Sequence, residues 1–336
     1  MTKVVVGIIG AGRIGQLHAK NILLSDKYQL KAISDVYTDH LKDIDYLKAV
    51  PVITQNADDI LNDPEIDAVF ICSSTDTHID FITKAAKNNK HIFCEKPISF
   101  DIEKTKETLE VIKETGVKFQ VGFNRRFDTH FRKAHDVVRN GDIGTPHVIK
   151  ITSRDPEAPP EEYVKRSGGL FIDMAIHDFD MIRYLSGQDV KNITVKASSL
   201  VDDRFSRNDD VDTAIITLTF ADDSLGVIDN SRQAVYGYDQ RIEVFGNNGM
   251  VQVENQKPTN VKVSTYAAVT EDKPMYFFLE RYNEGYIAEI HDFAQSILED
   301  KPVVAKFEDG LQAELLAKAA KLSWKENRTV ELSELR

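Results

Sequence analysis

The feature that most constrains the fold is a strand–glycine–helix segment at the start of the chain. Residues 3–9 form a nearly continuous apolar run, which is typical of a parallel strand that is buried on both faces. The sequence G-A-G-R-I-G follows at once as Gly10–Gly15, and an amphipathic helical pattern begins within it. A G-x-G-x-x-G motif between a strand and a helix predicts a dinucleotide-binding βαβ unit.

Each glycine of this motif has a physical reason. Gly10 permits the tight turn, Gly12 lets the backbone approach a pyrophosphate, and Gly15 lets helix and strand pack closely. The phosphates then meet the free N–H groups at the helix N-terminus. We therefore expect cofactor contacts at Gly10, Gly12, Arg13 and Ile14.

An acidic residue at the end of the next predicted strand indicates which cofactor is bound. Asp35 follows residues 30–34 and stands 20 positions after Gly15. Its carboxylate is expected to accept hydrogen bonds from the adenosine ribose hydroxyls and to repel a 2′-phosphate. Residues 36–38 supply no arginine, although Arg13 offers partial compensation. The sequence therefore favours NAD over NADP.

The alternation of strands and helices continues to residue 123. Apolar runs at 67–72, 90–94 and 117–123 predict further strands of a six-stranded parallel sheet. The loop after the first of these runs supplies Ser73, Thr75 and His78, which suit helix capping and cofactor contact equally. Glu95 and Lys96 end the next strand, before Pro97, and are predicted to lie beside the cofactor as well.

The second half of the chain has a different pattern. Short strands with period-two alternation between residues 146 and 265, and the Asn247–Gly249 turn, predict an open, largely antiparallel mixed sheet. The expected fold is thus α/β plus α+β: a Rossmann NAD-binding domain (1–123) and a substrate-binding and oligomerisation domain (124–336). Because an open sheet face is often covered by another subunit, we expect a homo-oligomer, a dimer or a tetramer.

Composition excludes several classes of protein. The net charge of −12 argues against a nucleic-acid surface. No apolar run approaches the ~20 residues that span a bilayer, and the start of the chain reads as a strand rather than as a signal peptide. Two cysteines, Cys72 and Cys94, both end strand-like runs, so a disulfide framework is not expected. We expect a soluble, cytoplasmic protein without a membrane partner.

A second motif lies at Gly168–Asp180. After a glycine pair, apolar residues from Ile172 to Ile182 follow a helical period, which predicts one continuous helix. Asp173 and His177 share a neighbouring stripe, four residues apart. Histidine suits proton transfer near neutral pH. A metal site at this segment is not expected, because the sequence shows no zinc-type ligand spacing.

Taken together, the motif at 10–15, Asp35, the Glu95–Pro97 tripeptide and the segment 168–180 resemble the Gfo/Idh/MocA oxidoreductase family over essentially the whole chain. Within that family, residues 120–128 and 153–156 look most like those of inositol 2-dehydrogenases. The resemblance implies NAD-dependent oxidation of myo-inositol to scyllo-inosose.

The resemblance also implies site residues. Lys96, Asp173 and His177 correspond to the catalytic trio, with His177 as the base and Lys96 stabilising the alkoxide. Plausible hydroxyl-binding residues are Asn124, Arg125, Arg154, Asp155 and Tyr236. Two alternatives stay open: a dehydrogenase for scyllo-inositol or a related sugar, and a non-catalytic dinucleotide-binding regulator on the same fold.

Overall fold

The computed structural model describes residues 3–335, which form two compact units. The first unit contains the chain up to Phe127 together with Gly285–Glu314, and the second contains Asp128–Glu284 and the chain from Leu315 onward. This packing differs from the simple division at residue 123 that the sequence suggests. The reason is that buried Ile290, Phe293 and Ala294, near the chain's end, belong to the hydrophobic core of the first unit. Residues 1–2 and 336, at the ends of the predicted domains, lie outside the described residues.

The first unit is built on a parallel six-stranded sheet in the order β3-β2-β1-β4-β5-β6. This is the doubly wound order of a Rossmann fold, so the predicted fold is confirmed. The strands are β1 (Val4–Ile9), β2 (Tyr28–Ser34), β3 (Val52–Thr54), β4 (Ala68–Ile71), β5 (His91–Cys94) and β6 (Phe119–Val121).

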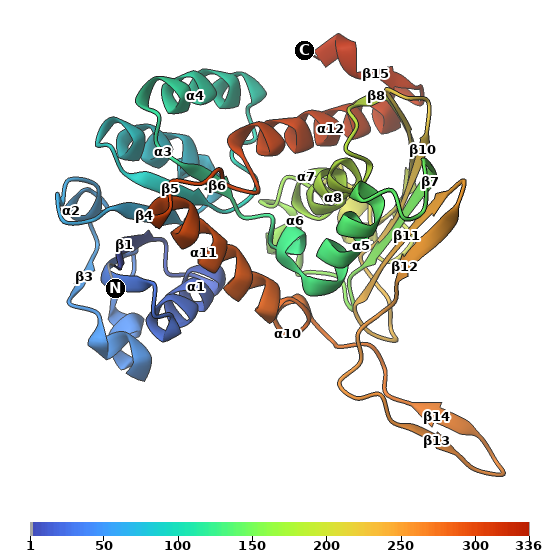
Figure 1. Cartoon of the computed structure of the whole chain (residues 1–336), viewed down its shortest axis with the longest axis horizontal. Coiled ribbons are helices and arrows are strands. Elements are labelled where there is room, and N and C mark those ends of the chain that lie inside the picture. The colour runs from blue at the N-terminus through green and yellow to red at the C-terminus, as the bar shows by residue number, and fades with distance from the viewer. Residues whose placement is uncertain (1–2, 336) are drawn as a thin grey trace. The chain divides into compact units, whose positions relative to one another are not determined.

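Helices connect these strands (Figure 1). They are α1 (Arg13–Leu24), α2 (Asp58–Leu61), α3 (His78–Lys87) and α4 (Ile102–Thr115), with short 3₁₀ segments η1 (Asp39–Asp43), η2 (Asp45–Ala49), η3 (Thr75–Thr77) and η4 (Asn124–Phe127). Helix α11 (Asn283–Leu298) and the beginning of α12 (Phe307–Glu326) return to this unit. The core includes stacked Phe70 and Phe93 rings 4.8 Å apart, with Phe293 of α11 at 5.8 Å from Phe70.

The second unit is built on a seven-stranded sheet in the order β12-β11-β7-β10-β9-β8-β15. Only β7 and β10 are parallel among its described pairs, so the predicted mixed, largely antiparallel sheet is confirmed. The strands are β7 (Pro146–Arg154), β8 (Val190–Ser198), β9 (Thr213–Phe220), β10 (Leu225–Ser231), β11 (Asp239–Gly246), β12 (Gly249–Val253) and β15 (Val330–Glu331).

One face of this sheet is covered and the other is open. Helix α5 (Thr129–Arg139) packs against β12, and helix α8 (Ile176–Ser186) packs against β7. The two helices also contact each other. In β9, Ala214, Ile216, Leu218 and Phe220 are buried while alternate residues are more exposed, as the pattern predicts. A hairpin of β13 (Lys262–Ser264) and β14 (Val269–Glu271), which the sequence did not indicate, extends away from the sheet (Figure 1).

Short helices complete the second unit: α6 (Glu161–Val164), α7 (Leu170–Asp173), α9 (Asp203–Arg207), α10 (Phe278–Arg281) and the 3₁₀ segment η5 (Leu332–Leu335). The prediction of one continuous helix through Asp173 and His177 is wrong, because α7 ends at Asp173 and α8 begins at Ile176. The Ala175 N–H donates to the Leu170 carbonyl (2.9 Å), five residues back, which interrupts the regular helical ladder.

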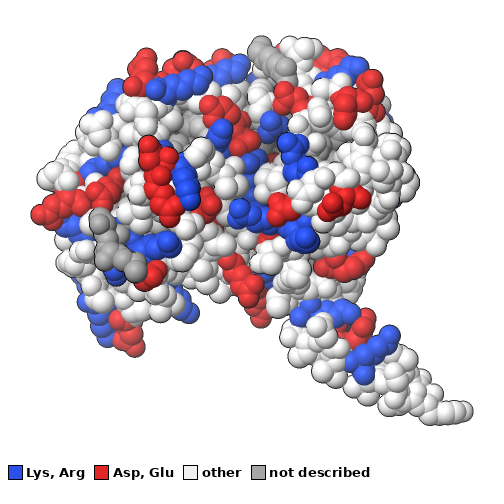
Figure 2. Space-filling model, in the orientation of Figure 1, with Lys and Arg blue, Asp and Glu red and all other residues white. Residues whose placement is uncertain are grey.

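Acidic and basic side chains are interspersed over much of the face in Figure 2. Among residues 3–335, the helices all fall short of the length and apolarity required to cross a bilayer.

Glu314 of α12 fixes the segment that follows Pro97 in the first unit. Its carboxyl oxygens accept hydrogen bonds from the Ser99 N–H (2.9 Å) and from the Thr105 hydroxyl (2.9 Å). The side chain is 1% exposed, and burial raises its pKa from 4.5 to about 7. Between these values the folded state holds a proton that the unfolded state has lost, so stability falls as the pH rises through this window.

We predict that Glu314→Gln removes this part of the pH dependence. In the wild type, the free energy of unfolding of the first unit falls by about 3 kcal/mol between about pH 4.5 and about pH 7. Urea denaturation at several pH values, with Glu308→Gln at an exposed position of the same helix as the control, measures the difference. Equal pH dependence in wild type and Glu314→Gln would contradict the assignment.

Candidate active site

The cofactor half of the site begins where β1 passes into α1. Gly10 has φ +95°, and a Cβ atom there would lie 2.4 Å from the Ser73 backbone nitrogen. A Cβ atom on Gly15 would lie 1.9 Å from the Gly10 carbonyl oxygen, whereas one on Gly12 would meet nothing within 4 Å. The first and third glycines are therefore required by packing. The second faces open space, as a pyrophosphate-binding glycine must.

The N-terminus of α1 suits an anion. Gly12 is its N-cap and supplies no side-chain cap, and the first turn carries no acidic residue. Arg13 is exposed and Ile14 is partly buried. Backbone N–H groups and the positive end of the helix dipole are thus available to phosphate oxygens.

Asp35 closes the glycine loop from the β2 side. Its Oδ2 accepts a hydrogen bond from the Ala11 N–H (2.7 Å), and its Oδ1 accepts one from the Tyr37 N–H (3.0 Å). The neighbouring Val36 and Tyr37 side chains are more than 70% exposed. The carboxylate is thereby held at the edge where a ribose would extend from the glycine loop.

The loop after β4 is tied to the segment after β5 by His78. The Ser73 hydroxyl lies 2.7 Å from the Thr77 hydroxyl, while Ser73 and Thr75 are partly buried. His78 is 1% exposed, with Nδ1 2.9 Å from the Pro97 carbonyl oxygen and Nε2 3.1 Å from that of Ser73. Burial lowers its pKa. Its imidazole is an internal link between the two loops.

Lys96 lies in the segment after β5. It is partly buried, and the Lys96–Pro97 peptide is cis. The preceding Glu95 side chain accepts a hydrogen bond within the unit, with its Oε1 2.8 Å from His18 Nε2. The first unit also holds Asn124 and Arg125, both buried in η4.

The substrate half of the predicted site lies in the second unit, where two parallel strands end together. Arg154 of β7 pairs with Ser231 of β10. The residues that follow are Asp155 and Arg232, and the Arg232 guanidinium donates to the Asp155 carboxylate (3.1 Å). It also donates to Asp173 at 2.8 Å. Parallel strands thus place their carboxyl ends at one edge of the sheet.

Charged and phenolic side chains surround this edge. Burial alone would lower the pKa of Arg232, but the charges of Asp173 and Asp155 raise it, so the guanidinium stays protonated. The Tyr163 hydroxyl donates to Asp173 (2.8 Å). Arg154 is ion-paired or hydrogen-bonded to Asp229, Tyr236 and Asp239. We define the carboxyl-edge cluster as the residues in these contacts, which are Arg154, Asp155, Tyr163, Asp173, Asp229, Arg232, Tyr236 and Asp239.

Sequence reasoning missed four members of this cluster: Tyr163, Asp229, Arg232 and Asp239. Arg232 was detectable in principle, because it directly follows a strand of alternating character. That β10 lies parallel to β7, however, is a property of the topology and not of any local pattern.

His177 lies in the first turn of α8 and is partly buried. Asp178, beside it, is fully buried and accepts a hydrogen bond from the Asn230 amide (2.9 Å), and Asp180 is also buried. Asp173 and His177 belong to the second unit, whereas Lys96 belongs to the first. Within residues 3–335, the group of three histidine, cysteine or acidic side chains close enough to share an ion is His18, Glu95 and Glu289.

Comparison with known proteins identifies the family. Residues 4–123 match the model of an oxidoreductase family with an NAD-binding Rossmann fold, and residues 131–252 match the GFO/IDH/MocA C-terminal domain. A myo-inositol 2-dehydrogenase of Thermotoga maritima is 45% identical over 98% of this chain and 99% of its own. The chain belongs to the Gfo/Idh/MocA family.

Two further relatives support this membership. An uncharacterized oxidoreductase of Bacillus subtilis is 52% identical over 96% of this chain and 95% of its own. The crystal structure of a Lactobacillus casei scyllo-inositol dehydrogenase with bound NAD(H) and scyllo-inositol superposes with a TM-score of 0.92 at 31% identity, covering 99% of this chain and 100% of that one. This member of the Gfo/Idh/MocA family is therefore an NAD oxidoreductase, and its first unit binds NAD.

We predict that Asp35→Ser weakens the preference for NAD over NADP. Loss of the carboxylate removes a ribose acceptor and the repulsion of a 2′-phosphate, so the ratio of the NADPH and NADH dissociation constants should fall by about tenfold, about 1.4 kcal/mol. Fluorescence titration with both cofactors measures it. Asp45→Ser, at an exposed position of η2, is the matched control. An unchanged ratio in Asp35→Ser would refute the assigned role.

Proposed function

We propose that this protein oxidises myo-inositol to scyllo-inosose with NAD. The observation that carries the proposal is the 45% identity over nearly the full length to a relative named myo-inositol 2-dehydrogenase. The Rossmann site for NAD and the polar carboxyl-edge cluster support it, because the reaction requires a dinucleotide and a surface that recognises hydroxyl groups.

The proposed chemistry follows from the bonds that change. NAD accepts a hydride from the carbinol carbon, and the hydroxyl must lose its proton as the hydride departs. His177 is proposed as the base that takes this proton, since an imidazole is a suitable acceptor near neutral pH. Lys96 is proposed to donate a hydrogen bond to the same oxygen and to stabilise the developing alkoxide. Asp173, held by Arg232 and Tyr163, is proposed to set the local charge and the orientation of its neighbours.

Recognition of the ring is assigned to the expected hydroxyl-binding residues. Arg154, Asp155 and Tyr236 belong to the carboxyl-edge cluster, whereas Asn124 and Arg125 belong to the first unit. In this cluster each guanidinium already faces carboxylates. Such a surface suits a neutral polyol better than an anionic substrate, which would meet the carboxylates.

A second candidate substrate is scyllo-inositol. It is favoured by the structural similarity to the Lactobacillus casei enzyme bound to that isomer. Related sugars form the rest of this alternative. Initial rates of NADH formation on myo-inositol, scyllo-inositol and glucose separate these substrates. A protein that binds NADH and oxidises none of them would instead be a dinucleotide-binding regulator.

We predict that Lys96→Ala lowers kcat on myo-inositol by about a thousandfold, because a donor to the developing alkoxide is lost. NADH binding should persist, since the glycine loop and Asp35 are untouched. Stopped-flow turnover and fluorescence titration of NADH measure the two effects.

Lys104→Ala, at an exposed position of α4, is the matched control and should retain wild-type turnover. Near wild-type activity of Lys96→Ala would contradict the proposed mechanism. Loss of both activity and NADH binding would leave Lys96 a cofactor ligand and would contradict its role on the alkoxide.

We further propose that the protein assembles as a dimer or tetramer through the open face of the second unit's sheet, in the cytoplasm. Ile215, Leu225, Phe245 and Met250 on this sheet are 45–50% exposed, a row of apolar side chains that a second copy would cover. Both cysteines are free, as expected in a reducing compartment. Light scattering should report an oligomer that Ile215→Lys dissociates. A monomeric wild type would contradict this assembly.

A further inference from the structure

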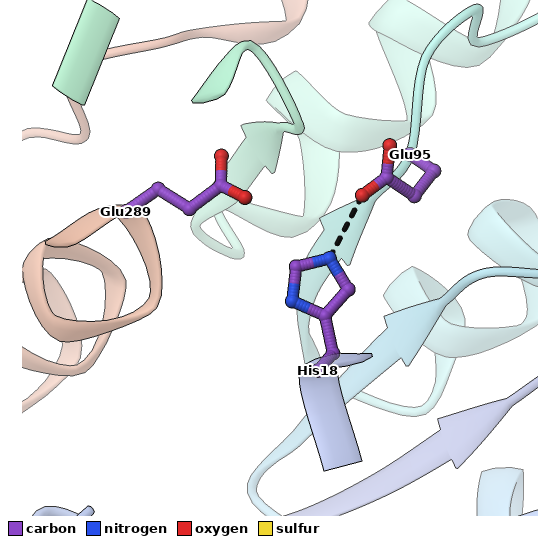
Figure 3. Close-up of side chains that lie close together, drawn as sticks. All are labelled: His18, Glu95 and Glu289. Atoms are coloured by element: carbon purple, nitrogen blue, oxygen red, sulfur yellow. Dashed lines mark hydrogen bonds and ion pairs between the residues drawn. The ribbon is translucent and has the colours of Figure 1, made fainter. Parts of the chain in front are cut away.

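A mostly buried cluster that includes Glu95, the residue before Lys96, plays no part in the chemistry described so far. It consists of His18 from α1, Glu95 after β5 and Glu289 from α11, all in the first unit. One nitrogen or oxygen atom from each side chain lies within 4.8 Å of the others. Figure 3 shows that the Glu289 carboxyl and the His18–Glu95 pair face one another. His18 and Glu289 are 0% exposed.

The position of the His18 imidazole is fixed by its neighbours. Its ring lies 5.0 Å from Phe93 and 5.9 Å from Tyr286, in edge-to-face contacts. Its Nε2 is 2.8 Å from Glu95 Oε1. On the other side of Glu95, a Cβ atom on Gly122 would lie only 3.0 Å from the carboxyl carbon. The Glu95 side chain is therefore held between α1 and the end of β6.

Three other polar atoms of this cluster have no hydrogen-bond partner. His18 Nδ1 and both carboxyl oxygens of Glu289 are buried without a hydrogen-bond partner. When Nε2–H donates to Glu95, Nδ1 carries a lone pair. An ionised Glu289 would add a second buried carboxylate with nothing to stabilise it. Burial, and then the charge of Glu95, raise the pKa of Glu289 well above its ordinary value.

We propose that Glu289 is a neutral carboxylic acid that supplies the missing donor to His18, and that these two residues position Glu95 and hence Lys96. In this chain the Glu289 hydroxyl donates to one water molecule and that water donates to His18 Nδ1, since the two side chains make no direct hydrogen bond. His18 Nε2–H then donates to the Glu95 carboxylate. This inference rests on the proposed function in one respect, which is that Lys96 takes part in the reaction.

The backbone on both sides of Lys96 is then restrained by buried imidazoles. On the N-terminal side, His18 holds the Glu95 side chain, and the Glu95 N–H donates to the Ile71 carbonyl (2.9 Å). On the C-terminal side, His78 lies 2.9 Å from the Pro97 carbonyl oxygen. A rigid backbone helps a lysine to reach one substrate oxygen, because small displacements of a catalytic group lower the reaction rate.

The decisive comparison is between Glu289→Gln and Glu289→Leu. The Gln amide keeps a donor without a charge, so kcat on myo-inositol should stay within about threefold of wild type. The Leu variant keeps the volume but loses the donor, so kcat should fall by about tenfold or more, with KM and the NADH dissociation constant nearly unchanged. Glu289→Met serves as the apolar variant if Glu289→Leu does not fold. Equal impairment of the Gln and apolar variants would overturn the proposal.

A readout without turnover separates this inference from the proposed function. Infrared difference spectra of wild type against Glu289→Gln should show a carboxylic acid C=O band at neutral pH, where an ordinary glutamate is ionised. Absence of the band, or a stoichiometric metal ion found by elemental analysis and lost in Glu289→Gln, would overturn it. A wild type that keeps the band but oxidises no polyol would contradict only the proposed function.

Discussion

The contact between Gly15 and the Gly10 carbonyl is the constraint on which the first unit depends. A Cβ atom at position 15 would overlap that oxygen, so α1 can approach β1 only with glycine there. The same close approach sets where the free N–H groups of α1 point. It also places His18, one turn further along α1, against Glu95. The anion-binding end of α1 and the place of His18 beside Glu95 thus both follow from the close packing of one helix on one strand.

The second unit depends on a buried arginine that is shared by two carboxylates. Its parallel pair, β7 and β10, brings Asp155 and Arg232 to one edge, and the buried guanidinium joins Asp155 to Asp173. An arginine shared by two carboxylates satisfies charge and hydrogen bonding together, which an isolated buried ion cannot do. The result is a fixed set of polar groups, which we propose as the part of the second unit that binds the hydroxyl groups of the substrate.

Local sequence patterns predicted those features that depend on residues close together in the sequence. The glycine motif between β1 and α1 was predicted correctly, since it depends on a few neighbouring residues. The break between α7 and α8 was not, because it depends on one backbone bond from Ala175. The partners of Asp173 and Glu95 were also hidden: Arg232, His18 and Glu289 reach them from distant segments. The roles of Lys96 and His177 stay predictions.

The proposed function requires that a hydride passes from a ring carbon of myo-inositol to NAD. The most direct measurement uses myo-inositol deuterated at the carbon that becomes the ketone of scyllo-inosose, with wild-type protein and NAD. Hydride transfer should place the deuterium on C4 of the nicotinamide in the product, and a primary isotope effect should slow turnover when this step limits the rate. Oxidation without transfer of the label, or reduced cofactor that carries only solvent hydrogen, would contradict it.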